Sequence, residues 1–128
     1  MIAPDVAAQP RTKRVLLVED DEAQRAAMSR ALAKAGFEVI AAADGARAVD
    51  AARALRPDAV VVDVFLPDAG GLGVARALRA VLSAVPILFV TGLAIAGVRE
   101  ALAPAPVLFK PFSRKQLLSS VRRIAGEA

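Results

Sequence analysis

The chain has 128 residues, a length that fits one domain with a hydrophobic core of its own. It contains no Cys and no His, which excludes disulfides, thiolate sites and imidazole ligands, so any bound metal must be held by oxygen atoms. A net charge of +4 would suit a nucleic-acid surface, but the Arg and Lys residues are spread over several segments without aromatic residues between them. We therefore expect no nucleic-acid binding by this domain.

Two segments raise the question of targeting or membrane insertion. Residues 1–13 lack the apolar stretch of a signal peptide, and we expect them to form a disordered tail. Residues 80–98 carry no charge, a length that would admit a transmembrane helix, but Pro86, Gly92 and Gly97 divide them into shorter pieces. We therefore expect a cytoplasmic protein without a membrane span.

The first half of the chain predicts three strands separated by two helices. Short apolar runs at 14–18, around Val39 and at 59–62 are typical of buried strands. Apolar residues at helical spacing predict the two helices between them. Those expected to face the core are Met28, Ala31, Leu32 and Ala35 in the first helix, and Ala48, Val49, Ala52 and Leu55 in the second. Gly36 suits a left-handed cap after the first helix, and Pro57 ends the second.

The second half continues the alternation of strand and helix. We expect a turn at 67–73, strands at 87–90 and 107–109, and a short helix at 97–102 between those two strands. Ser113, followed three residues later by a Gln, predicts a capping box that begins the last helix. The residues expected to face inward are Val74, Ala77, Leu78 and Val81 in the third helix, and Leu117, Leu118, Val121 and Ile124 in the last.

Strands that are apolar throughout, each followed by a helix, predict an α/β fold. We expect a five-stranded parallel sheet with helices on both faces, doubly wound as in flavodoxin, in a single domain. Ligands of such sheets bind at the carboxyl ends of the strands. The residues at those ends that could do chemistry are Glu19, Asp20, Asp63, Thr91 and Lys110. The fold therefore predicts that three acids, a hydroxyl and an ammonium group converge at one edge of the sheet.

Three carboxylates in one place repel one another unless a cation neutralises them. Mg²⁺ is the fitting cation, because it prefers hard oxygen ligands. Asp63 could then act as a nucleophile on a phosphoryl donor and form an aspartyl phosphate, with Lys110 and Thr91 contacting the phosphoryl oxygens. Each of the five residues also has a simpler interpretation, as a helix-terminal acid, a turn former, a strand exit or a solvated lysine.

Four motifs occur together in this order: "VLLVEDDEAQR", "RPDAVVVDVFLPDAGGL", "PILFVTG" and "VLFKPFS". With them the chain resembles the receiver domain of two-component response regulators, and we assign residues 14–126 to that domain. The resemblance implies a signalling domain rather than an enzyme. It implies that Asp63 is the phosphoacceptor, phosphorylated by a histidine kinase or a histidine phosphotransfer protein in a reaction that depends on Mg²⁺.

The same resemblance assigns a role to each of the other residues. Asp20 would bind Mg²⁺ directly and Glu19 mostly through a bound water, while Asp63 and the backbone carbonyl of Phe65 would complete the protein ligands. Thr91 would bind a phosphoryl oxygen. Lys110 would pair with the phosphate, and its peptide bond to the following Pro is expected to be cis.

The sequence also departs from the family. Where relatives carry Tyr or Phe three residues before the lysine, this chain has Val107, so the usual aromatic switch is not expected. We expect the ring of Phe109 to be one strand position out of phase and to face the opposite side of the sheet. Segment 92–109 is shorter than usual, which predicts a reduced fourth helix. Phe65 and Leu93 occupy positions that tune hydrolysis in the family, and because neither can orient a water we expect a long-lived acyl phosphate.

Two other functions stay open at this point. A small nucleotide or flavin binder would carry a Gly-rich or hydroxyl-rich phosphate loop after the first strand, where this chain has "VEDDEAQ". A degenerate receiver that docks other proteins without phosphate is compatible with Val107 and the short fourth helix. The sequence leaves open whether the receiver stands alone or belongs to a hybrid kinase, and which kinase and output it serves.

Overall fold

Five strands and five helices alternate along the chain in the computed structural model, which describes residues 12–67, 69–93 and 96–126. The strands are β1 (Arg14–Val18), β2 (Glu38–Ala42), β3 (Ala59–Asp63), β4 (Ile87–Thr91) and β5 (Val107–Phe109). The helices are α1 (Glu22–Lys34), α2 (Gly45–Leu55), α3 (Gly70–Val81), α4 (Val98–Leu102) and α5 (Arg114–Ala125). Most of the predicted tail lies outside the described residues, but the carbonyl of Lys13 already accepts a hydrogen bond from the Glu38 amide at 3.0 Å.

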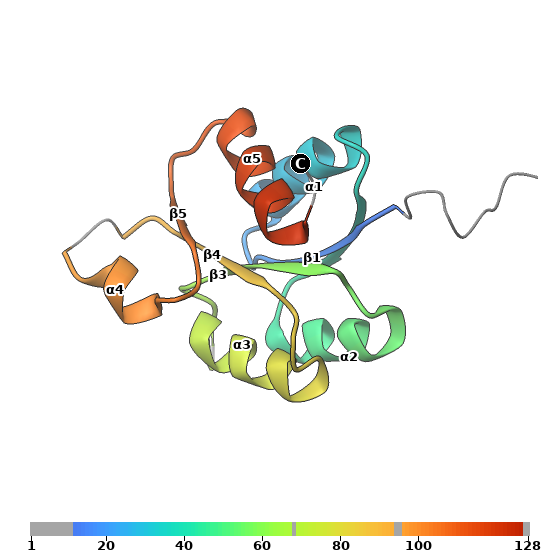
Figure 1. Cartoon of the computed structure of the whole chain (residues 1–128), viewed down its shortest axis with the longest axis horizontal. Coiled ribbons are helices and arrows are strands. Elements are labelled where there is room, and N and C mark those ends of the chain that lie inside the picture. Colours follow the sequence, from blue (N-terminus) through green and yellow to red (C-terminus); the bar gives the residue numbers. More distant parts are fainter. Residues whose placement is uncertain (1–11, 68, 94–95, 127–128) are drawn as a thin grey trace, which may run out of the picture.

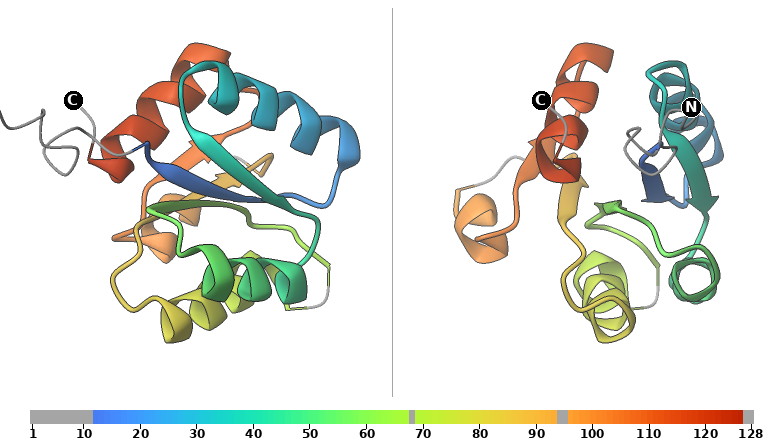
Figure 2. Two further views of the ribbon diagram at one scale, coloured as in Figure 1. Left: turned by 90° about the vertical axis from the view of Figure 1, so that its right-hand side faces the viewer. Right: turned by 45° about the vertical axis from the view of Figure 1, so that its right-hand side comes forward.

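All five strands run parallel, in the order β2-β1-β3-β4-β5. Helices α1 and α5 cover one face of the sheet, α2 and α3 cover the other, and α4 lies beside β5 (Figures 1 and 2). This arrangement confirms the predicted doubly wound α/β fold. None of the described helices combines the length and the apolar character that a bilayer crossing requires.

The core divides into two clusters because successive side chains of a strand point to opposite faces. On one face Leu16 and Val60 pack with residues of α2 and α3, and on the other Leu17 and Val61 pack with residues of α1 and α5. Every residue of β3 and β4 is buried. Asp63 ends the first of these strands, so a carboxylate enters the interior only where the strand meets the loops.

Two residues expected in the core are exposed instead. Leu55 is the last residue of α2 and is 39% exposed, because the chain leaves the helix at the next residue, Arg56, in a left-handed conformation with φ 46°. Ala77 is exposed as well, and its place is taken by Ala75, which is 2% exposed and packs in the same cluster as Val74. The other inward residues predicted for the helices are buried or pack against the core.

Helix α3 begins earlier than predicted. The expected turn at 67–73 contains the first residues of α3, which starts at Gly70. Gly71 permits this early start, because a Cβ at this position would collide with the backbone carbonyl of Asp63 and lie 2.7 Å from the Cα of Val64. At the end of the chain, the predicted capping box of α5 is confirmed: the Ser113 side chain accepts from the amide of Gln116, and the Gln116 side chain accepts from the Ser113 amide.

The prediction for Phe109 is wrong. Val107 and Phe109 are two residues apart in β5, so they share a face, and both pack against the cluster that includes α2 and α3, whereas Leu108 packs against the opposite cluster. The guanidinium of Arg99 in α4 lies 5.0 Å from the centre of the Phe109 ring, and its Nη1 donates to the carbonyl of Val107 at 3.4 Å. These contacts hold α4 against β5. The helix has five residues and is short, as predicted.

Candidate functional site

Two acids follow β1 directly. Glu19 is 1% exposed, and its amide donates to the carbonyl of Ala42, the last residue of the neighbouring strand β2. Asp20 is exposed. Helix α1 is capped by the next acid, Asp21, whose side chain accepts a hydrogen bond from the Gln24 amide at 2.8 Å. Among the acids that precede α1, it is therefore Asp21 and not Glu19 whose side chain caps the helix.

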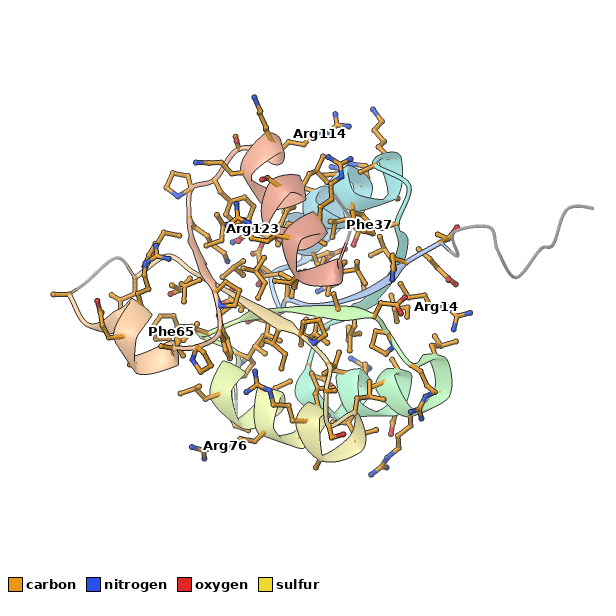
Figure 3. All side chains as sticks on the ribbon, in the orientation of Figure 1. Arg14, Phe37, Phe65, Arg76, Arg114 and Arg123 are labelled. Atoms are coloured by element: carbon orange, nitrogen blue, oxygen red, sulfur yellow. The ribbon has the colours of Figure 1, made fainter. Side chains whose placement is uncertain are left out.

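Asp63 and Lys110 meet at the carboxyl end of the sheet. Asp63 is 6% exposed, and its Oδ1 accepts from the Phe65 amide at 2.8 Å. Lys110 follows β5, and its Nζ donates to Asp63 Oδ2 at 2.8 Å and to Glu19 Oε1 at 2.9 Å. One ammonium group thus bridges two buried carboxylates, one after β1 and one ending β3. In Figure 3, Phe65, which follows Asp63 by two residues, lies at the opposite end of the molecule from Arg14, the first residue of β1.

The environment changes the acidity of two of these groups. Burial raises the pKa of Glu19, although the hydrogen bonds from Lys110 and from the Asp21 amide oppose the effect, and the charge of Asp63 adds to it. Burial alone would lower the pKa of Lys110, but the hydrogen bonds to Asp63 and Glu19 and the charges of both acids outweigh it, so the pKa of Lys110 is raised. The lysine is therefore held as a cation between the two carboxylates.

The same acids form a candidate metal centre. Glu19, Asp20 and Asp63 each offer a carboxylate oxygen, and these three oxygens lie within 4.8 Å of one another. The donor set consists of hard oxygen atoms, which Mg²⁺ prefers, and the exposed carboxylate of Asp20 leaves the cluster accessible to solvent. The residues present therefore fit a divalent cation of this type.

Phe65 follows Asp63 by two residues and Thr91 ends the neighbouring strand β4, but neither takes part in these ion pairs. Thr91 is completely buried, and its Oγ1 accepts from the Leu93 amide at 3.1 Å. Its backbone carbonyl accepts from the Lys110 amide at 2.8 Å, which fixes the lysine beside the end of β4. The side chain of Phe65 is 58% exposed and that of Leu93 is 40% exposed. Of the five residues predicted at the ends of the strands, the structure joins the side chains of Glu19, Asp20, Asp63 and Lys110 in one cluster. The Thr91 side chain is not part of that cluster.

Two features of the site were not singled out from the sequence. Arg25 of α1 donates through Nη1 to the backbone carbonyls of Glu19 at 3.0 Å and Asp20 at 3.3 Å. Gly71 lets the start of α3 approach the backbone of Asp63. Both positions lie inside the quoted motifs, but their roles depend on tertiary contacts that no residue spacing displays.

Sequence comparison connects these residues to known proteins. The sequence model of the response regulator receiver domain family matches residues 15–122. The response regulator MprA of Mycolicibacterium vanbaalenii is 40% identical over 114 residues, which cover 87% of this chain and 49% of that protein. MprA of Mycobacterium avium is 39% identical over 114 residues, covering 87% and 50%. The chain thus spans about half the length of these curated relatives.

Solved structures give the same result. The receiver domain of the sensor histidine kinase PA1611 from Pseudomonas aeruginosa, which holds a magnesium ion in its active site cleft, is 34% identical, with a TM-score of 0.81 and coverage of 91% of this chain and 100% of that one. The chemotaxis protein CheY4 of Vibrio cholerae is 31% identical, with a TM-score of 0.80 and coverage of 89% and 99%. Since the family model matches most of the chain and the solved structures share its fold, the chain belongs to the response regulator receiver domain family.

Proposed function

We propose that this chain is a cytoplasmic phosphoacceptor receiver of a two-component signalling system, phosphorylated on Asp63 by a histidine kinase or histidine phosphotransfer protein in a Mg²⁺-dependent reaction. The observation that carries the proposal is the contact of the Lys110 Nζ with both Asp63 and Glu19, next to the carboxylate of Asp20. The arrangement supports the proposal because a carboxylate, an ammonium group and further carboxylate oxygens lie together at the carboxyl end of the sheet, where a nucleophile, a cation and metal ligands would be needed.

Asp63 is positioned to act as the nucleophile. Hydrogen bonds from the Phe65 amide and from Lys110 hold its two oxygens, so the carboxylate has a fixed orientation. A bond forms between a carboxylate oxygen and the phosphorus atom, while the phosphorus–nitrogen bond of the donor phosphohistidine breaks and its electron pair leaves with the imidazole. Lys110 stays beside the reacting group and offsets the negative charge on the phosphoryl oxygens.

The acids would hold the metal ion. Mg²⁺ supplies positive charge to the phosphoryl oxygens when it is bound. We assign its ligation to Asp20, Asp63 and the Phe65 carbonyl, with Glu19 acting mostly through water. Glu19 is buried, and both of its oxygens already accept hydrogen bonds, one from Lys110 and one from the Asp21 amide, which is compatible with an indirect role.

Thr91 supplies a hydroxyl donor in this proposal. Its Oγ1 accepts from the Leu93 amide, so its own hydrogen is available to a phosphoryl oxygen. Phe65 and Leu93 place exposed apolar side chains two residues beyond Asp63 and Thr91, respectively. Neither can hydrogen-bond an attacking water, so we propose that the acyl phosphate is long-lived.

The direct test is phosphorylation by a small-molecule phosphodonor. The wild type and Asp63→Asn are incubated with the donor and Mg²⁺, or with the donor and a chelator, and their intact masses are measured. We expect one phosphoryl group on the wild type with Mg²⁺ and none on Asp63→Asn. An equal gain in both proteins would disprove the assignment of Asp63.

The same experiment separates this function from a docking module that works without phosphate. That second function is favoured by Val107, which leaves β5 without a ring at the switch position, and by the five residues of α4. If the wild type takes up no phosphate under conditions in which it is folded and binds Mg²⁺, the docking function becomes the better explanation.

A further inference from the structure

Arg25 contacts the backbone that carries the two acids after β1. Its Nη1 donates to the carbonyl of Glu19 at 3.0 Å and to that of Asp20 at 3.3 Å, while its own amide donates to the Asp21 carbonyl at 2.8 Å. The side chain is half-buried. A single guanidinium nitrogen therefore ties together two consecutive peptide groups of the loop.

The position is electrostatically unfavourable for a cation in two ways. Arg25 follows the first turn of α1, near the positive end of the helix dipole, where acids rather than cations are stabilised. It also adds positive charge close to a cluster that fits a divalent cation, and like charges repel. Charge alone therefore predicts that Arg25 weakens metal binding.

We propose that Arg25 is a positioning residue for the metal site: it fixes the peptide groups of Glu19 and Asp20 so that their carboxylates converge with Asp63. This inference rests on the proposed Mg²⁺-dependent function. The ends of the loop are anchored by the Glu19 amide, which donates to Ala42, and by the cap of α1. Between these anchors, Arg25 binds the two carbonyls and fixes the backbone from which the Asp20 carboxylate projects.

The two physical effects of Arg25 have opposite signs, which makes the proposal testable. Loss of the charge alone would tighten Mg²⁺ binding, whereas loss of the positioning hydrogen bonds would weaken it. Residues that orient metal ligands contribute a factor of 10–100 to metal affinity, and we expect roughly a tenfold weakening, because the loop keeps its other anchors.

The experiment is calorimetric titration of Mg²⁺ into the full chain as wild type, Arg25→Gln, Arg25→Lys and Arg30→Gln. Arg30 is exposed on the same helix and supplies the matched control for charge, so Arg30→Gln should bind Mg²⁺ as the wild type does or slightly more tightly. Arg25→Gln should bind roughly tenfold more weakly, and Arg25→Lys, which keeps the charge but has a shorter reach, should also bind more weakly than the wild type.

A second measurement reports on the loop without metal. Amide hydrogen exchange at Asp20 and Asp21 should be faster in Arg25→Gln than in the wild type, whereas exchange in β3 and β4 should be unchanged. Unchanged or tighter Mg²⁺ binding by Arg25→Gln overturns the positioning role and leaves the proposed function intact. If Arg25→Gln does not fold, Arg25→Lys decides instead: an Mg²⁺ affinity equal to that of the wild type also overturns the positioning role. A wild type that fails to bind Mg²⁺ overturns both proposals.

Discussion

Replacement of Lys110 by Met removes a cation that contacts two buried carboxylates. The Nζ lies 2.9 Å from Glu19 and 2.8 Å from Asp63, and the three side chains are 20%, 1% and 9% exposed, respectively. Removing one partner of a buried ion pair costs about 3–5 kcal/mol, because the remaining charge has no compensation. We expect roughly 3 kcal/mol here, at the lower end, since solvent reaches the cluster at Asp20. For a chain of this length that corresponds to a fall in Tm of roughly 10–15 °C.

The assay is thermal and urea unfolding of the wild type and Lys110→Met at pH 7, with a chelator or with Mg²⁺. Mg²⁺ should stabilise the variant more than the wild type, because a bound divalent ion replaces the lost positive charge and acts on the folded state alone. Lys115→Met is the control: Lys115 is exposed on α5 and makes no ion pair with any described residue, so its stability should stay within about 0.5 kcal/mol of the wild type. Equal stability of Lys110→Met and the wild type in chelator, or equal protection of both by Mg²⁺, would refute this reasoning.

Three further predictions concern packing, phosphate lifetime and pH. Gly71→Ala should lower the free energy of unfolding in urea by about 1–3 kcal/mol, because its Cβ meets backbone atoms of β3 and the loop after it, whereas Gly92→Ala, with no atom within 4 Å of its Cβ, should not; equal losses would contradict this. Phe65→Asn should orient a water and shorten the half-life of the acyl phosphate roughly tenfold, equivalent to ~1.4 kcal/mol of activation barrier, while Leu72→Asn, at another exposed apolar position, should not. The half-life is measured by following intact mass over time, and a wild-type half-life of seconds would contradict the proposed stability of the phosphate. Because the pKa of Lys110 is raised above its ordinary 10.5, its stabilising contribution is complete below pH 10.5 and is lost as the pH rises through the higher folded value; urea unfolding should show this loss in the wild type and not in Lys110→Met.

The order of the elements and the approximate place of the site could be predicted because both follow from local patterns. Continuous apolar runs mark strands buried on both faces, and the carboxyl ends of parallel strands meet at one edge of the sheet. That rule selected Glu19, Asp20, Asp63, Thr91 and Lys110. The structure brings the three acids and the lysine together, whereas among the described residues the Thr91 hydroxyl accepts only from the Leu93 amide. The predicted cis bond between Lys110 and the following Pro is confirmed as well.

The rest depended on contacts between elements. Helical spacing placed Leu55 in the core, but spacing does not show that α2 ends there and leaves the side chain 39% exposed. The early start of α3 depends on the close approach of Gly71 to the backbone of Asp63. The wrong face assigned to Phe109 has another origin, because alternation along a strand already places residues two apart on the same face, and the packing of Val107 and Phe109 shows it.

The three residues of β5 also limit how other chains can bind. An exposed edge strand invites a second chain to extend the sheet through unpaired backbone groups. The edge strand β5 has only three residues, and it is bounded by Pro106 and Pro111, which have no amide hydrogen to donate. The carbonyl of Val107 is already bound by Arg99. Strand addition at β5 would therefore find few unpaired backbone groups.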